Sequence, residues 1–246
     1  MRQSLVISAR AMDALTQRMA VTSNNLANIN TVGYKKDLTL ITSFRDALNS
    51  NINSIQDTEI PSNVKSVTDF SPGNFRFTND KLNMALQGEG FFKIQLENGQ
   101  TAYTRKGTFK LDNQNRLVAG DNQFVLGKNG VITIPEGEFS VDREGVIRDK
   151  DGNEFNQITT VNFPKPYALE KNGNSMFVTL NSNQAELRAD IEIKQMYVEE
   201  SNVDELSSML EMISMMESMR QYESNQKVVQ LQDQATGQLL SQIGRV

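Results

Sequence analysis

Residues 203–243 decide the fold class of this chain and read VDELSSMLEMISMMESMRQYESNQKVVQLQDQATGQLLSQI. The stretch holds no Pro and a single Gly, as a long helix requires, because both residues disfavour helix interiors. Its apolar residues recur at helical spacing, first at Leu206, Leu210, Ile213 and Met216, and later at Tyr222, Val229 and Leu240. The spacing predicts one helix of about 60 Å at 1.5 Å per residue.

A second helix is predicted at the other end of the chain, over about residues 4–28. Its apolar residues lie seven apart, which is the spacing that packs one helix along another. The members of this heptad seam are Leu5, Met12, Met19 and Leu26, with Leu15 three residues after Met12.

The end of this first helix is marked by Asn28, Asn30 and Gly33, residues that commonly stop helices. Lys35 and Lys36 follow directly. We expect their positive charges to complement the C-terminal end of the helix dipole.

Between the two helices, residues 64–198 carry short strand-like runs separated by turn signals. Alternation of apolar and polar residues is clear in 131–134 and 139–142, and Asn98-Gly99 is one of several hairpin signals. We therefore predict an α+β fold. Residues 1–36 and 200–246 form a coiled-coil-like helical assembly domain, and residues 64–199 form an antiparallel sandwich or irregular barrel. Residues 37–63 are polar and predict a linker or adaptable extension.

Composition narrows the function. Of 246 residues, 38% are hydrophobic and 7% aromatic, which favours an elongated molecule that buries further apolar surface between subunits. The net charge of −5 argues against nucleic-acid binding. The absence of Cys and His removes thiolate sites and the commonest general acid and metal ligand. No apolar run is long enough to span a bilayer. We expect no catalytic residue, cofactor or metal.

Two local motifs have ordinary explanations. Gly88-Glu89-Gly90 lacks the helix and the Lys-Ser/Thr pair of a phosphate loop, so a turn before a strand explains it better. The acidic residues at 149–154 resemble part of a calcium loop, but Lys150 and the missing final Glu favour hairpin turns.

The C-terminal helix carries an unusually wide apolar band. Five Met residues lie within eleven positions: Met209, Met212, Met215, Met216 and Met219. They are too many for one helix face. An ordinary core is one explanation, but Met adapts to irregular partners, so we favour a broad contact surface.

Charge also separates by segment. Residues 1–36 carry a net +4 and residues 198–246 a net −5. One hypothesis is that the two helices pair, within or between subunits, with Arg10 and Arg18 facing acids such as Glu211 and Glu217. The alternative is two solvated faces, because exposed ion pairs contribute little.

Four stretches resemble the flagellar basal-body rod, hook and hook-associated proteins. The first is Ser23-Asn24-Asn25-Leu26-Ala27-Asn28-Ile29-Asn30-Thr31-Val32-Gly33-Tyr34-Lys35-Lys36, which is similar to the N-terminal signature of that family. The others are Gln87–Phe92, Ala102–Phe109, and Ser201–Val203 with the helix that contains Met219–Lys227. They occur in the family's order and cover nearly the whole chain. Ile29-Asn30 and the Met-rich helix depart from the family pattern.

The resemblance implies a non-enzymatic structural subunit of the basal-body rod. It would assemble helically with copies of itself and with other rod and hook proteins. It would be exported unfolded by the flagellar export apparatus without a cleaved signal peptide, and would lie in the periplasmic span of the rod if the cell has two membranes. Hook proteins are usually much longer, so within the family the resemblance favours a rod subunit. The chain looks most like the proximal-rod type and next like the distal-rod type, because distal-rod proteins usually have a longer segment between the N-terminal signature and the β domain.

Alternatives of other classes are a secreted β-domain binding module and a carboxylate-dependent glycan hydrolase. The predicted assembly interface comprises the apolar seams of both helices and three signature residues. These are Leu5, Met12, Leu15, Met19, Asn25, Leu26, Asn28, Gly33, Leu206, Leu210, Ile213, Met216, Met219, Tyr222, Val229 and Leu240.

Overall fold

The computed structural model describes residues 2–41, 64–120, 123–134, 137–179, 185–188 and 191–243. The chain divides into two compact units. Unit 1 comprises Met1–Asn28, Lys36–Asp69 and Val203–Val246, and unit 2 comprises Ile29–Lys35 and Phe70–Asn202. Each unit is therefore assembled from segments that lie far apart in the sequence.

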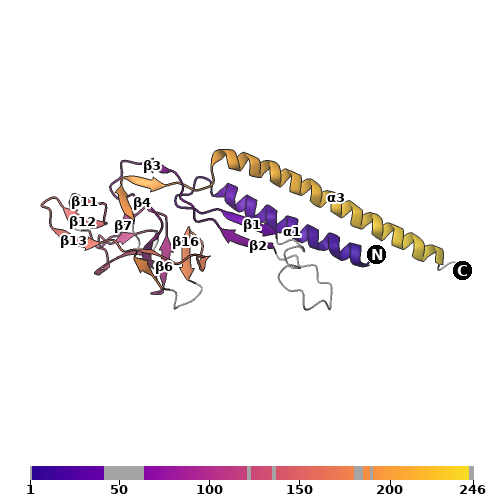
Figure 1. The fold of residues 1–246 in the computed structure, drawn as a ribbon, viewed down its shortest axis with the longest axis horizontal. Coiled ribbons are helices and arrows are strands. Elements are labelled where there is room, and N and C mark those ends of the chain that lie inside the picture. Colours follow the sequence, from indigo (N-terminus) through magenta and orange to yellow (C-terminus); the bar gives the residue numbers. More distant parts are fainter. Residues whose placement is uncertain are drawn as a thin grey trace. The chain divides into compact units, whose positions relative to one another are not determined.

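Unit 1 is built on the two predicted helices, α1 (Arg2–Ala27) and α3 (Glu205–Ile243), which lie side by side (Figure 1). Strands β1 (Asp37–Ile41) and β2 (Val64–Thr68) pair antiparallel and contact α1. Residues 42–63 of the predicted linker lie outside the described residues. Among the helices that the structure describes, none combines the length and apolarity needed to cross a bilayer.

Unit 2 consists of short strands, and every pairing among those described is antiparallel. The strands are β3 (Phe75–Phe77), β4 (Met84–Gln87), β5 (Phe91–Gln95), β6 (Thr101–Thr104), β7 (Lys110–Leu111), β8 (Leu117–Val118), β9 (Phe124–Gly127), β10 (Gly130–Val131), β11 (Phe139–Val141), β12 (Val146–Asp149), β13 (Glu154–Gln157), β14 (Thr160–Asn162), β15 (Leu169–Lys171), β16 (Met176–Thr179), β17 (Leu187–Arg188), β18 (Glu192–Gln195) and β19 (Tyr197–Glu199).

The largest sheet has the strand order β15-β16-β6-β5-β9-β8-β7, with β10 beside β9, β14 beside β5 and β17 beside β14. Smaller sheets are β11-β12-β13, β18-β4 and β19-β3. The α+β class with terminal helices and a β-rich middle is thus confirmed. The strands that the structure describes do not close into a barrel.

Strand β5 is buried on both faces, so it contributes side chains to two separate apolar clusters of unit 2. Phe92 and Ile94 point into the main apolar cluster, which also contains Leu86 and Leu117. Phe91 belongs to a second, aromatic cluster with Tyr103, Val161, Phe163 and Phe177. Successive side chains of a strand point to opposite faces, so the adjacent Phe91 and Phe92 serve two different cores. Unit 2 therefore buries most of its large apolar side chains within itself, although Phe77, Leu111, Phe155 and Leu187 are exposed.

Candidate assembly interface

The side of α3 that packs on α1 is lined mainly by small and polar side chains. Ser208 and Ser218 are buried on α3, and Thr22 is buried on α1. The Arg18 guanidinium of α1 donates a hydrogen bond of 2.8 Å to the Ser214 hydroxyl of α3. The least exposed described positions of this stripe are Ser208, Glu211, Ser214, Met215, Ser218, Tyr222, Asn225 and Val229. Little apolar surface is therefore buried from α3 in this helix pair.

The opposite side of α3 carries the large apolar side chains and leaves them exposed. Leu210 is 67% exposed and Ile213 is 57% exposed. The rest of this outward face comprises Met209, Met212, Met216, Met219, Val228 and Leu231. An apolar surface that continues over several turns of one helix indicates a site of protein association.

The predicted seam residues therefore fall into different environments. Leu210, Ile213, Met216 and Met219 lie on the outward face of α3, whereas Tyr222 and Val229 are half-buried. On α1, Met12, Leu15, Met19 and Leu26 are half-buried. Leu5, Leu206 and Leu240 lie on the helices, but their side chains, like that of Arg10, are outside the described part of the chain.

Asn25 braces the end of α1 within unit 1. Its side chain is 2% exposed, and its amide donates to the Asp37 carbonyl at 2.8 Å while its Oδ1 accepts from the Asp37 amide at 3.0 Å. Asn28 donates from its side chain to the Asn24 carbonyl at 2.8 Å. These two predicted interface residues thus join the helix end to β1 and to itself, within one chain.

Gly33 occupies a position that only glycine fits. Its φ of +69° lies in the left-handed region, and a Cβ there would lie 2.5 Å from the backbone nitrogen of Lys106. The Gly33 amide also donates to the Glu199 carbonyl at 2.8 Å. The residue therefore lets residues 29–35 lie directly against the backbone of unit 2.

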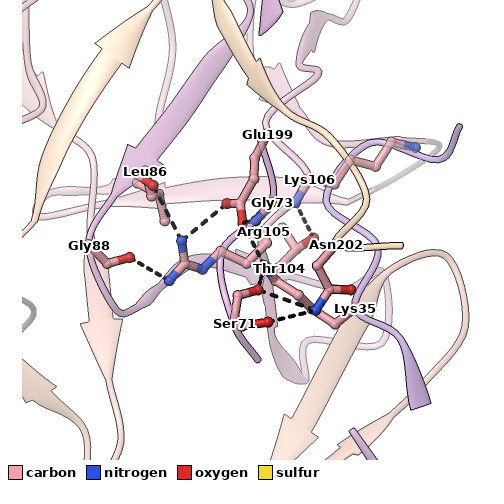
Figure 2. Close-up of polar contacts among 10 residues, drawn as sticks. All are labelled: Lys35, Ser71, Gly73, Leu86, Gly88, Thr104, Arg105, Lys106, Glu199 and Asn202. Atoms are coloured by element: carbon pink, nitrogen blue, oxygen red, sulfur yellow. Dashed lines mark hydrogen bonds and ion pairs between the residues drawn. The ribbon is translucent and has the colours of Figure 1, made fainter. Parts of the chain in front are cut away.

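Figure 2 shows a buried charge cluster that Lys35, two residues after Gly33 in the sequence, forms with Arg105 and Glu199. Glu199 is 0% exposed, and its Oε1 accepts from the Lys35 ammonium at 2.5 Å while its Oε2 accepts from the Arg105 guanidinium at 3.1 Å. Lys35 and Arg105 are 1% and 3% exposed. We call these three residues the buried triad. The assignment of Lys35 to the helix dipole was wrong, because α1 ends at Ala27 and the Lys35 charge is instead paired inside unit 2.

Backbone groups add further hydrogen bonds to the buried triad, although the Nε of Arg105 is buried without a hydrogen-bond partner. The Lys35 ammonium also donates to the Ser71 carbonyl at 2.7 Å, and Arg105 donates to the carbonyls of Leu86 and Gly88 at 3.3 and 2.7 Å. The Gly73 amide donates to Glu199 at 3.1 Å. Two cations against one carboxylate leave an excess positive charge, and these carbonyl dipoles offset it, as buried charge requires.

Sequence reasoning missed this cluster although a signal for it was present. Lys35 lies in the first of the four family-like stretches, Gly88 in the second and Arg105 in the third, and Glu199 lies two residues before the fourth. Stretches that share one family resemblance but lie far apart in sequence are candidates for a common site. No spacing rule links residues 35, 105 and 199, so the pairing itself could not be foreseen.

Glu211 is the one polar residue on α3 that the helix pair places unfavourably among those described. Its Oε2 is buried without a hydrogen-bond partner. Burial raises the pKa of Glu211, the charge of Lys36 lowers it and that of Asp204 raises it again. The Glu211 carboxyl is therefore easier to protonate than an ordinary glutamate.

Three family models match the chain. Residues 5–35 match the flagella basal body rod protein model, residues 85–148 the flagellar hook protein FlgE/F/G D1 domain, and residues 194–242 the flagellar basal body rod FlgEFG protein C-terminal model. Two of these models cover the helices and the third covers strands of unit 2.

Whole-chain relatives agree with these matches. The flagellar basal-body rod protein FlgG of Caulobacter vibrioides is 33% identical over 270 residues, which cover 97% of this chain and 100% of the relative. FlgG of Bacillus subtilis is 31% identical, covering 98% and 99%. FlgF of Buchnera aphidicola subsp. Schizaphis graminum is 29% identical, covering 96% of each chain. Matches at both ends and in the middle, in one order and over the full length, show that the chain belongs to the flagellar basal-body rod protein family.

Proposed function

We propose that this chain is a structural, non-enzymatic subunit of the flagellar basal-body rod that joins its neighbours through the outward face of α3. Membership of the rod family makes it a rod-type axial subunit. The proposed interface rests on one observation: Leu210, Ile213 and their apolar neighbours are exposed on one side of α3. Partners would be copies of this chain and other axial proteins of the flagellum.

The energetics favour burial of this face in an assembly. Burying a Leu, Ile or Met side chain contributes about 1.5–3 kcal/mol relative to leaving it in water. The outward face offers eight such residues, Val228 included. Because these side chains are about half exposed in the single chain, burying all eight would contribute roughly 7–13 kcal/mol. This gain is comparable with the loss of translational and rotational freedom, roughly 4–15 kcal/mol per association event.

Within the assembly, the helices of unit 1 would form a coiled-coil-like layer. The seven-residue spacing of Leu5, Met12, Met19 and Leu26 supports this arrangement, because it suits packing along a helical partner. The serine-lined contact between α1 and α3 within one chain leaves most large apolar side chains of α3 free for such partners.

Within the family we propose the proximal-rod (FlgF-like) role, with the distal rod or a hook-type subunit as the alternatives. Support comes from the short segment between the signature and unit 2. Relatives of both names occur at similar identity, 33% for one FlgG and 29% for one FlgF. Complementation of strains that lack either subunit distinguishes the two roles, because only one strain should regain swimming. Export through the flagellar apparatus without a cleaved signal peptide, to the periplasmic span of the rod, belongs to the same proposal.

Leu210→Asp tests the interface. An unpaired carboxylate in a packed seam costs several kcal/mol, so cells that carry only this variant should lack complete rods and should not swim. The purified monomer should keep its circular dichroism spectrum and melting temperature, because Leu210 is exposed in the single chain.

The matched control is Gln226→Asp, which adds the same charge at an exposed polar position of α3 and should leave swimming intact. Normal rods in the Leu210→Asp strain would contradict the proposed interface. Loss of folding in the purified variant would show that Leu210 is packed within its own chain.

A further inference from the structure

We propose that Lys35, Arg105 and Glu199 act as a clasp that fixes the two stretches of unit 2 next to α1 and α3 in sequence, and so positions the connections to these helices for assembly. The inference rests on the proposed function as an axial subunit. It assigns the buried triad a positioning role that the outward face of α3 does not supply.

Two stretches of unit 2 lie next to the helices in sequence: residues 29–35 follow α1, and residues 199–202 precede α3. Between them the chain returns to unit 1 over Lys36–Asp69. We call these two stretches the crossings, and they are bonded to each other. The Gly33 amide donates to the Glu199 carbonyl at 2.8 Å, and the Asn202 amide donates to the Tyr34 carbonyl at 3.3 Å. The Lys35–Glu199 ion pair joins the same two crossings through side chains. The connection to α1 is therefore tied to the connection to α3.

Other residues tie the joined crossings to the body of unit 2. Arg105 links Glu199 to the carbonyls of Leu86 and Gly88, beside β4. On β15, Lys171 donates to the Lys35 carbonyl at 2.6 Å, and its ammonium lies 4.5 Å from the centre of the Tyr34 ring. Residues 29–35 are thus bonded to residues 199–202 and, through Lys171, to β15. Arg105 in turn bonds Glu199 to the carbonyls beside β4.

The triad is better suited to setting register than to adding stability. Desolvating a buried ion pair costs about as much as the pairing returns, so well-packed apolar residues can replace such a pair without loss of stability. What an apolar pocket cannot do is reject a shifted chain. A slip of one residue would place Lys36 at the Lys35 position, which keeps the charge, or Tyr34, which removes it. Either slip would also move Gly33 away from its close contact with Lys106.

This arrangement also determines how a mechanical load is shared. Because the crossings are bonded to each other, a pull on either helix connection must load both before one detaches. Independent crossings would instead peel from unit 2 one at a time.

Lys35→Met removes the charge and keeps most of the side-chain length, and chymotrypsin reports on the result. Tyr34 is 9% exposed, so cleavage after it requires residues 29–35 to detach. In the purified full chain, cleavage should accelerate on the order of a hundredfold, the factor expected when one partner of a buried pair is lost. Cells that carry the variant should build few complete rods.

The matched control is Lys165→Met, which breaks an exposed ion pair to Glu89 in the same unit. It should change neither cleavage nor rod number. Leu210→Asp separates this inference from the proposed function, because that variant should lose rods while Tyr34 stays protected. Unchanged cleavage in Lys35→Met, or faster cleavage with normal rods, overturns the clasp.

If Lys35→Met does not fold, hydrogen exchange of the unaltered full chain decides the question. The Gly33 and Asn202 amides, which make the two bonds between the crossings, should exchange as slowly as the core amide of Ile94. Exchange at the rate of exposed loop amides would show that the crossings open independently of the core and would overturn the inference.

Discussion

Ile94 in unit 2 and Ile213 in unit 1 illustrate how differently the two units treat the same kind of side chain. Ile94 is 0% exposed among Phe92, Leu117 and Val125, whereas Ile213 is 57% exposed on α3. Among its described residues, unit 2 also buries Lys35, Arg105 and Glu199, and pairs each of them with an opposite charge. Unit 1 buries serines between its helices and leaves leucine, isoleucine and methionine outside.

The difference shows that the units reach stability by different routes. A body with an apolar core of its own and buried charges that are paired with one another can fold alone. A helix pair with a largely polar contact gains little from folding alone, because helix stability comes mainly from packing an apolar face. Unit 1 is therefore expected to acquire most of its stability when neighbouring subunits cover α3.

The same substitution in each unit gives the largest contrast. Ile94→Ala should lower the free energy of unfolding of unit 2 by about 2–5 kcal/mol, because it removes buried methyl and methylene groups and leaves a cavity. Ile213→Ala should change the stability of the monomer by no more than about 0.5 kcal/mol. Urea unfolding of the purified variants measures both. Equal losses would show that α3 already has an apolar partner within the chain.

A glycine pair tests how tightly residues 29–35 pack within unit 2. Gly33→Ala combines a φ of +69° with a Cβ that would lie 2.5 Å from backbone, so we expect a loss of at least about 2 kcal/mol. Gly152→Ala has a similar φ of +85° but open space around the Cβ, so only the backbone strain of about 1 kcal/mol remains. A smaller loss at Gly33 than at Gly152 would mean that residues 29–35 do not pack as described.

Much of this fold follows from local sequence signals. Both terminal helices are confirmed, because long stretches nearly free of Gly and Pro with apolar residues at helical spacing have few alternatives. The turns at Asn98-Gly99, Asn129-Gly130 and Asp151-Gly152 connect β5 to β6, β9 to β10 and β12 to β13, and each Gly has a positive φ. Hairpin chemistry is local, which is why it is predictable.

The non-local features escaped prediction. Periodicity identified Leu210 and Ile213 as seam residues but could not tell which side of α3 meets α1. A buried serine stripe gives no hydrophobic signal. Lys35 next to a helix end suggested a dipole interaction, whereas its actual partner, Glu199, lies 164 residues away. Pairings over such separations depend on the folded topology and leave no spacing pattern in one sequence.

Overpacking the serine-lined contact should have an intermediate effect. Ser218 is 3% exposed between the helices, so Ser218→Leu would force the helices of unit 1 apart and cost about 1–3 kcal/mol. Ser224→Leu makes the same change at an exposed position of α3 and should be nearly neutral. Helix content by circular dichroism at increasing temperature measures the difference. If Ser218→Leu raises the melting temperature of the helices, the contact must contain space that the added side chain fills.

The smallest expected effect concerns Glu211. Burial raises its pKa in the folded chain, against the opposing charge of Lys36, so the folded state holds the proton more tightly than the unfolded state does. The resulting stabilisation of unit 1 is present below the unfolded pKa of about 4.3 and is lost as the pH rises through the folded value.

Glu211→Gln removes this pH dependence. It also replaces the carboxylate, whose Oε2 is buried without a hydrogen-bond partner, by an uncharged amide. The variant should therefore melt slightly higher than the natural chain at neutral pH, by no more than about 2 °C because the side chain is partly solvated. Below about pH 4 the two melting temperatures should converge, because Glu211 is then protonated in both states. Glu217→Gln, on the exposed side of α3, is the matched control. If Glu211→Gln instead lowers the melting temperature at neutral pH, the Glu211 charge must be stabilised by Lys36, and its burial in the helix contact would be the weaker influence.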